Sequence, residues 1–167
     1  MIYIENLKEK VSQKKQSEIG RALLQKGLKT EYDMRDMPMI LSGSYGKPYF
    51  AFHSDIHFNI SHCDIAVVCI LSRKPVGIDV EKIKSFDEEL ARYVTNPKEF
   101  EDLIKSDNPA LAFTILWTKK ESFMKLTGSG LTSKEEIQNI LSDNRVKFDS
   151  IINETGGYVI TSCEYIA

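Results

Sequence analysis

The stretch Val76-Gly77-Ile78-Asp79-Val80-Glu81 contains an alternating pattern that predicts a β-strand with two acidic residues on one face. Successive side chains of a strand point to opposite faces, so Ile78 and Val80 share one face while Asp79 and Glu81 share the other. Two neighbouring carboxylates repel each other unless a cation or a proton lies between them. A divalent ion with oxygen ligands would remove the repulsion, although two solvated acids on an exposed strand end fit the same pattern.

A third acidic residue lies on a long helix that we expect over residues 109–126. Asn108-Pro109 provides its start and Gly128 its end. Most of its residues are apolar, which is typical of a largely buried helix. Glu121 and Lys125 lie one turn apart and face the same way. An acid and a base on such a helix need partners, and a simple ion pair between the two is the alternative to a functional site.

Together the strand and the helix predict a metal site. Asp79, Glu81 and Glu121 could hold one Mg²⁺, an ion that keeps several waters and shares its coordination with substrate phosphates. Lys125 would then lie beside those phosphates. Such a set suits attack on a phosphorus atom, where positioning and charge neutralisation supply most of the catalysis.

The order of the expected elements indicates an α+β fold. The run 65–71 is almost uninterrupted apolar, so we expect it to be a central, buried strand. Residues 30–48 are rich in Gly and Pro and read mostly as loop and turn. A capping box at Ser85 predicts the start of a helix over 86–94. The other expected strands cover 1–4, 56–60, 76–80, 145–151 and 157–166, and the other expected helices cover 12–28 and 97–105, with one more opening at Ser133.

Composition limits the class of protein. The chain has 167 residues, a formal net charge of −2 and 42% hydrophobic residues, as ordinary globular proteins do. The absence of a signal-peptide pattern and of a run of about 20 apolar residues predicts a cytoplasmic protein without a membrane span. Three cysteines without C-x-x-C spacing argue against a disulfide framework and a thiolate zinc site. A sequence pI of about 6.0 and the lack of an aromatic and basic platform argue against nucleic-acid binding.

Two shorter segments carry groups suited to phosphate. Gly46-Lys47-Pro48 is a basic turn that could cradle a phosphate or a purine edge, or be no more than a turn. Phe58-Asn59-Ile60-Ser61-His62-Cys63 places Ser61 and His62 at a strand end, where each could donate to a phosphate. A structural role for a single histidine is the alternative.

These segments, in this order, resemble those of the Sfp-type 4′-phosphopantetheinyl transferases, in the holo-acyl-carrier-protein synthase superfamily. The family patterns read approximately G-K-P, F-N-[IL]-S-H-S, [VI]-G-[VI]-D-[IV]-E and W-[ST]-x-K-E-[SA]-[FY]-x-K, followed by G-x-G-L. This chain has GKP at 46–48, FNISHC at 58–63, VGIDVE at 76–81, WTKKESFMK at 117–125 and GSGL at 128–131. The VGIDVE and WTKKESFMK segments at this separation are the most specific part of the resemblance.

The resemblance implies an enzyme that transfers the 4′-phosphopantetheine arm of coenzyme A (CoA) to a serine of an apo acyl or peptidyl carrier protein and releases 3′,5′-ADP. The implied cofactor is Mg²⁺, with Mn²⁺ as an alternative, held by Asp79, Glu81 and Glu121. Glu121 would also take the proton of the carrier serine, and Lys125 would contact the pyrophosphate. A CoA- or carrier-binding module without transferase activity, and an Mg²⁺-dependent phosphohydrolase on the same scaffold, are the alternatives.

The resemblance also implies a CoA site and a fold. Lys47 and Pro48 would flank the adenosine end, Ser61 and His62 would bind phosphate, and Arg21 would meet the 3′-phosphate. The implied fold is two similar lobes, related by a pseudo-two-fold axis, with CoA at their interface. We expect the lobes to cover 1–77 and 78–167 and the protein to be a monomer. The chain is shorter than the usual two-lobed members, chiefly before Gly46, so we expect a trimmed N-terminal lobe.

Overall fold

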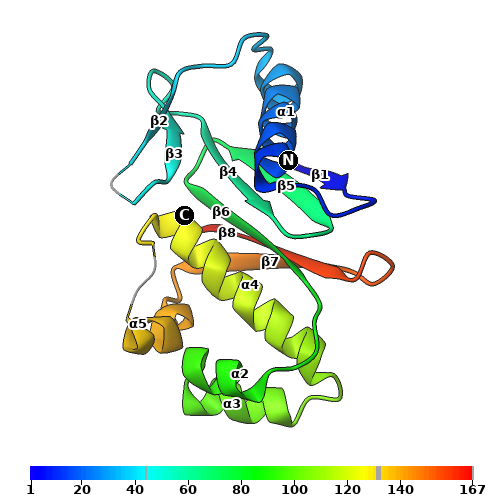
Figure 1. The fold of residues 1–167 in the computed structure, drawn as a ribbon. Helices are drawn as coiled ribbons and strands as arrows, with labels where there is room; N and C mark the ends of the chain where they lie inside the picture. Colours follow the sequence, from blue (N-terminus) through cyan, green and yellow to red (C-terminus); the bar gives the residue numbers. More distant parts are fainter. Residues whose placement is uncertain (44, 131–132, 167) are drawn as a thin grey trace.

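The computed structural model describes residues 1–43, 45–130 and 133–166 and contains two three-stranded antiparallel sheets within them (Figure 1). The strand order of the N-terminal sheet is β1 (Ile2–Asn6), β5 (Ala66–Ser72), β4 (His57–His62). The strand order of the C-terminal sheet is β6 (Val76–Lys82), β8 (Tyr158–Tyr165), β7 (Val146–Asn153). In register, Tyr3 pairs with Cys69 and Asp79 pairs with Thr161.

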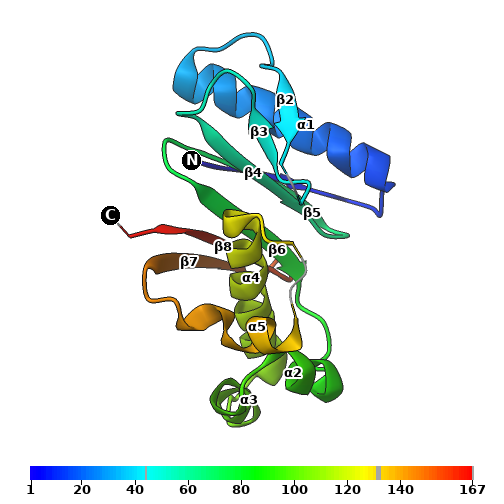
Figure 2. The ribbon, with the colours of Figure 1, turned by 90° about the vertical axis from the view of Figure 1, so that its left-hand side faces the viewer.

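The two sheets share one topology. In each, the strand that comes last along the chain lies between the first and the middle strand. In each, a long helix follows the first strand and packs on the sheet: α1 (Gln13–Tyr32) on the first and α4 (Pro109–Thr127) on the second. Figure 2 shows the resulting layers, from α1 through the two sheets to α4. The expected boundary at residue 77 falls inside β6, and the division into lobes stays a prediction.

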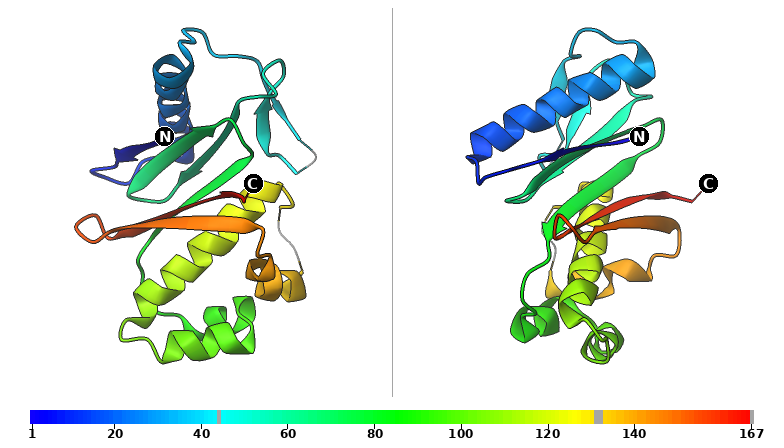
Figure 3. Two further views of the ribbon diagram at one scale, coloured as in Figure 1. Left: turned by 180° about the vertical axis from the view of Figure 1, so that it is seen from behind. Right: turned by 90° about the vertical axis from the view of Figure 1, so that its right-hand side faces the viewer.

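Strand β5 is the predicted central strand, and both of its faces are buried. Val67, Cys69 and Leu71 pack in the core cluster that includes α1. Ala66, Val68 and Ile70 pack in a second core cluster with residues of the other sheet. This second cluster joins the two sheets and explains why the run has no polar residue at alternate positions. Seen from behind in Figure 3, the two sheets lie one above the other along this shared core.

The region expected to be loop contains a short hairpin, β2 (Ile40–Ser42) and β3 (Pro48–Phe50). Its strands have three residues each, too few to show a period in the sequence. Ile40 pairs with Phe50, which is buried, while Leu41 pairs with Tyr49 and both are exposed. The hairpin lies beside the N-terminal sheet, next to the C-terminal end of α4 (Figure 1).

Short helices pack beside α4 and against one another: α2 (Glu88–Val94), α3 (Pro97–Ile104), α5 (Lys134–Asn139) and the 3₁₀ turn Ile140–Ser142. The start predicted for the first of them was wrong by two residues, because Asp87 caps α2 by accepting from the Leu90 amide at 3.0 Å. The starts expected at Asn96 and Ser133 are confirmed, each by a capping box. None of the helices in the described ranges is both long and apolar enough to cross a bilayer.

Candidate functional site

Three side chains from three different elements meet where the two sheets join: Asp79 of β6, Ser61 of β4 and Lys125 of α4. Asp79 is only 3% exposed. Its Oδ1 accepts hydrogen bonds from Ser61 Oγ at 2.8 Å and from Lys125 Nζ at 2.7 Å. Lys125 Nζ also donates to Ser61 Oγ at 2.7 Å. The buried carboxylate therefore has an ionic partner and a hydroxyl donor, as a charge in the protein interior requires.

Gly77 permits the approach of α4 to β6. A Cβ at this position would lie 2.0 Å from the Ser122 carbonyl oxygen and 2.7 Å from the Leu126 amide nitrogen. No side chain fits between a strand and helix backbone at that separation. The missing side chain thereby brings Lys125, one turn along the helix from Ser122, within reach of Asp79.

The FNISH segment of β4 joins the two sheets through side chains. Asn59 Oδ1 accepts from the Ile78 amide at 3.0 Å, and Ser61 Oγ accepts from the Val80 amide at 3.3 Å. Asn59 and Ser61 are both buried. In this structure Ser61 faces Asp79, so the phosphate contact expected of it stays a prediction.

Glu81 and Glu121 lie in the electrostatic field of Asp79. Burial, followed by the charge of Asp79, raises the pKa of Glu81 to about 7. The same two causes, in the same order, raise the pKa of Glu121. Because the charge of Asp79 makes ionisation of Glu81 and of Glu121 less favourable, a further positive charge beside these carboxylates would be stabilised.

The geometry of this acidic group fits a metal ion in part. Asp79 Oδ2 is buried and has no hydrogen-bond partner in the structure, so one ligand atom is available. Among the described residues, however, no three His, Cys, Asp or Glu side chains stand close enough together to form an assembled metal site. The side chains of the three predicted ligands therefore do not point to one common position in this structure.

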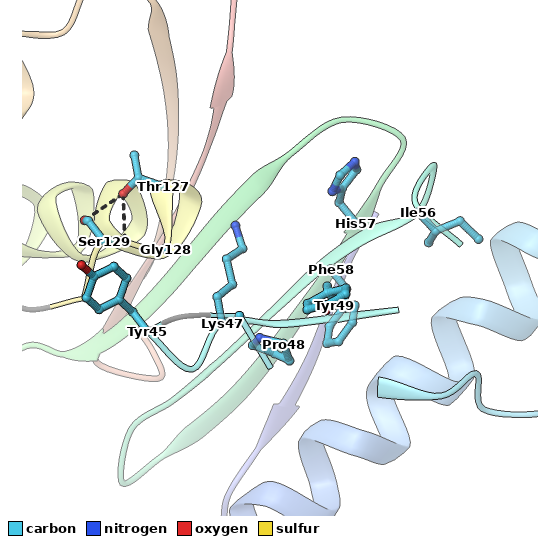
Figure 4. A pocket seen from close by; sticks show the side chains of 11 residues that line it. Tyr45, Lys47, Pro48, Tyr49, Ile56, His57, Phe58, Thr127, Gly128 and Ser129 are labelled. Carbon is cyan, nitrogen blue, oxygen red and sulfur yellow. Dashed lines mark hydrogen bonds between the residues drawn. The ribbon is translucent and has the colours of Figure 1, made fainter. Parts of the chain in front are cut away.

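Lys47 and Pro48 line two cavities between the β2–β3 hairpin and the end of α4. Figure 4 shows the side chains that line the first. The first has a volume of about 420 Å³ and the second about 340 Å³. Glu121 and Lys125 also line the second, so the structure brings the GKP turn to the acidic group. Lys47 Nζ donates to the Leu126 carbonyl oxygen at 2.7 Å, and burial lowers its pKa.

His62 and Arg21 lie further from this arrangement. His62 lines a third cavity of about 320 Å³ together with Glu81. Partial burial, followed by the positive charge of Lys125, lowers the pKa of His62. Arg21 is exposed on α1 and lines none of these three cavities. Its contact with a 3′-phosphate stays a prediction.

Lys120 is a residue of the WTKKESFMK segment to which the sequence analysis gave no role. It is fully buried, and its Nζ donates to Glu99 Oε2 at 2.8 Å and to the Ile137 and Gln138 carbonyl oxygens at 2.8 and 3.3 Å. It thereby ties α4 to α3 and α5. The only sequence signal was the capping-box glutamate Glu99, whose second role at Lys120 requires the tertiary structure.

Known proteins are similar to this chain over the segment that contains these residues. The model of the 4′-phosphopantetheinyl transferase superfamily matches residues 75–161. The chain is 43% identical over 90 residues to a 4′-phosphopantetheinyl transferase of Bacillus subtilis, covering 53% of this chain and 40% of that protein. It is 35% identical over 117 residues to the 4′-phosphopantetheinyl transferase Sfp of Bacillus subtilis (strain 168), covering 68% of this chain and 52% of Sfp.

A third relative is the 4′-phosphopantetheinyl transferase gsp of Aneurinibacillus migulanus, 46% identical over 89 residues, with 52% of this chain and 37% of gsp covered. The matched part of this chain thus spans about half or less of the length of these curated relatives. The superfamily match contains the first half of β8 and the whole of β6 and α4, and the latter two hold Asp79, Glu81, Glu121 and Lys125. The chain therefore belongs to the 4′-phosphopantetheinyl transferase superfamily.

Proposed function

We propose that this protein transfers the 4′-phosphopantetheine arm of CoA to a serine of an apo acyl or peptidyl carrier protein and releases 3′,5′-ADP. The observation that carries the proposal is the buried Asp79–Lys125 pair with Glu81 and Glu121 in its electrostatic field. A binding module has no need for this concentration of buried charge, whereas transfer to a serine needs a base and a cation beside the phosphorus. Superfamily membership supports the same reaction.

We infer that Mg²⁺, or Mn²⁺ in its place, is held by Asp79 and Glu121, with Glu81 bound directly or through water. The unpartnered Asp79 Oδ2 and the repulsion of Glu81 and Glu121 by the Asp79 charge support this assignment. All three donors are carboxylate oxygens, which such hard cations prefer. When bound, the ion would neutralise charge on the pyrophosphate oxygens.

The side chains of this protein then have separate tasks. Glu121 accepts the proton of the carrier serine, whose oxygen forms a bond to the phosphorus that bears the pantetheine. The bond from that phosphorus to the bridging oxygen breaks, and 3′,5′-ADP leaves with the electron pair. Lys125 Nζ stabilises the negative charge of the departing phosphate, and Asp79 holds Lys125 in place through the 2.7 Å contact.

We assign the adenosine end of CoA to the two cavities beside Lys47 and Pro48, and a phosphate to His62. The shared topology of the two sheets supports two similar lobes with CoA bound where they meet. Because Ser61, Asp79 and Lys125 come from one chain, we propose that the monomer is the active unit.

Product analysis tests this function against hydrolysis. The protein should release 3′,5′-ADP from CoA only when an apo carrier is present, in equal amount to the phosphopantetheine gained by the carrier. Release of 3′,5′-ADP without a carrier would identify a phosphohydrolase and contradict the proposal. Tight CoA binding without release, on both acyl and peptidyl carriers, would indicate a binding module and contradict it equally.

A further inference from the structure

The turn Tyr45-Gly46-Lys47 and the segment Gly128-Ser129-Gly130 fit against each other in the walls of the two cavities. The first belongs to the β2–β3 hairpin and the second follows α4. Gly128 and Gly130 both have a φ of +68°, and each faces a side chain of the turn. A Cβ at Gly128 would lie 3.2 Å from Lys47 Cδ, and a Cβ at Gly130 would lie 3.5 Å from Tyr45 Cβ.

Lys47 ties the two segments together by a charged hydrogen bond. The Leu126 carbonyl oxygen belongs to the last turn of α4, where helix carbonyls lack partners within the helix. Lys47 Nζ satisfies it at 2.7 Å, and a cation at this end also suits the helix dipole. The ammonium is therefore committed to the helix end. Figure 4 shows the Lys47 side chain extended from the hairpin and the Tyr45 ring beside Ser129.

We propose that these two segments form a clasp in which Lys47 is a positioning residue, holding the hairpin against the end of α4. Both cavities are lined by Lys47 together with Gly128, so the clasp sets the separation of their walls. Lys47 then acts on the substrate through the position of Pro48 and the hairpin, and its ammonium makes no contact with a substrate phosphate. The part of this inference that concerns CoA rests on the proposed function.

Hydrogen exchange of the ligand-free protein tests the clasp without CoA. Lys47→Met keeps the apolar stem but removes the charged donor, so amides in residues 45–50 and 126–130 should exchange about tenfold faster together. Lys98→Met, at an exposed position on α3, is the control and should leave both segments unchanged. Unchanged exchange in Lys47→Met would overturn the clasp, whether or not the protein binds CoA.

Substitution of a glycine offers an independent test that leaves the ammonium in place. Gly128→Ala adds a methyl group against the Lys47 stem, whereas Gly157→Ala has the same φ of +68° and no atom within 4 Å of the added Cβ. Both variants bear the strain of a left-handed alanine, but only Gly128→Ala should speed exchange in residues 45–50. Equal exchange in the two variants would contradict the proposed contact.

Calorimetry with CoA and 3′-dephospho-CoA separates positioning from direct contact. If Lys47 positions the hairpin, Lys47→Met should raise the Kd of both ligands by the same factor, about tenfold. Gly128→Ala should also raise both Kd values by one common factor. The Kd values of the double variant should be no higher than those of the single variant that binds less tightly. A loss confined to CoA would assign Lys47 to the 3′-phosphate and overturn the positioning role. If the parent protein binds neither ligand, the proposed function fails while the exchange result still decides the clasp.

Discussion

Gly77→Ala should destabilise the fold and move helix α4 away from Asp79. The added carbon would lie 2.0 Å from the Ser122 carbonyl oxygen, where ordinary contact begins at 3.4 Å. The helix would have to retreat by about 1.4 Å, because the opposing atoms are backbone and cannot rotate away. Overpacking of this kind costs about 1–3 kcal/mol, and we take the upper end of that range. For a chain of this size about 3 kcal/mol lowers Tm by about 6–12 °C.

Thermal and urea unfolding, followed by circular dichroism, measure this loss. Gly43→Ala is the matched control, because its added carbon would lie 3.5 Å from the nearest atom, the Lys47 carbonyl oxygen, which is an ordinary contact. Gly43 is exposed and the added carbon has room, so the control should stay within about 1 kcal/mol of the parent. A Gly77→Ala protein as stable as Gly43→Ala would refute the argument that backbone contact at Gly77 sets the position of α4.

Lys120→Met should lower the free energy of unfolding by about 3 kcal/mol in urea, because it leaves Glu99 and two carbonyl groups without their cation; a loss below about 1 kcal/mol would contradict the tie between α4, α3 and α5. Of the three thiols, at most Cys63 should react readily with a disulfide reagent in the native state, and all three after unfolding, since Cys69 and Cys163 are buried; rapid reaction of all three in the native protein would contradict the core described above. Burial raises the pKa of the Cys69 thiol from 9.0 to about 12, so as the pH rises the unfolded chain loses this proton before the folded protein does. The free energy of unfolding should therefore fall above pH 9.0. A Tm that rises with pH in this range, and that Cys69→Ala does not change, would contradict this.

The elements with a long, regular pattern could be predicted from the sequence. The apolar run at 65–71 is the central strand β5, buried on both faces by α1 and by the second sheet. The hairpin at 40–50 could not be predicted, because three-residue strands carry no period and its stability depends on contacts with β4 and the core. The residue pattern could not predict the shared topology of the two sheets, because pairing order depends on contacts between distant segments; only the family resemblance implied two similar lobes.

Helix α4 shows why a pattern can identify a buried helix and still mistake its buried face. Its apolar majority predicted burial, yet several of its fully buried side chains are polar, including Thr118, Lys120 and Ser122. Small polar residues face β6 because the helix approaches Gly77 so closely. Thr118 Oγ1 shares a hydrogen bond with Thr161 Oγ1 at 2.7 Å, which satisfies both groups.

The site was predicted by residue type but not by pairing. The sequence alone left open an ion pair between Glu121 and Lys125, one turn apart. In the structure the ion pair of Lys125 is with Asp79, 46 residues away along the chain. Local spacing could not indicate this pair, because it depends on the contact between β6 and α4.

Intact mass of an apo carrier protein, after incubation with this protein, CoA and Mg²⁺, tests the central claim most directly. The carrier should gain the mass of one phosphopantetheine on its serine, and the gain should be absent with EDTA and fall at least a hundredfold in rate with Asp79→Ala. Hydrogen exchange should confirm that the Asp79→Ala protein is folded. Full transfer by Asp79→Ala, or no transfer by the parent protein to any acyl or peptidyl carrier, would contradict the account.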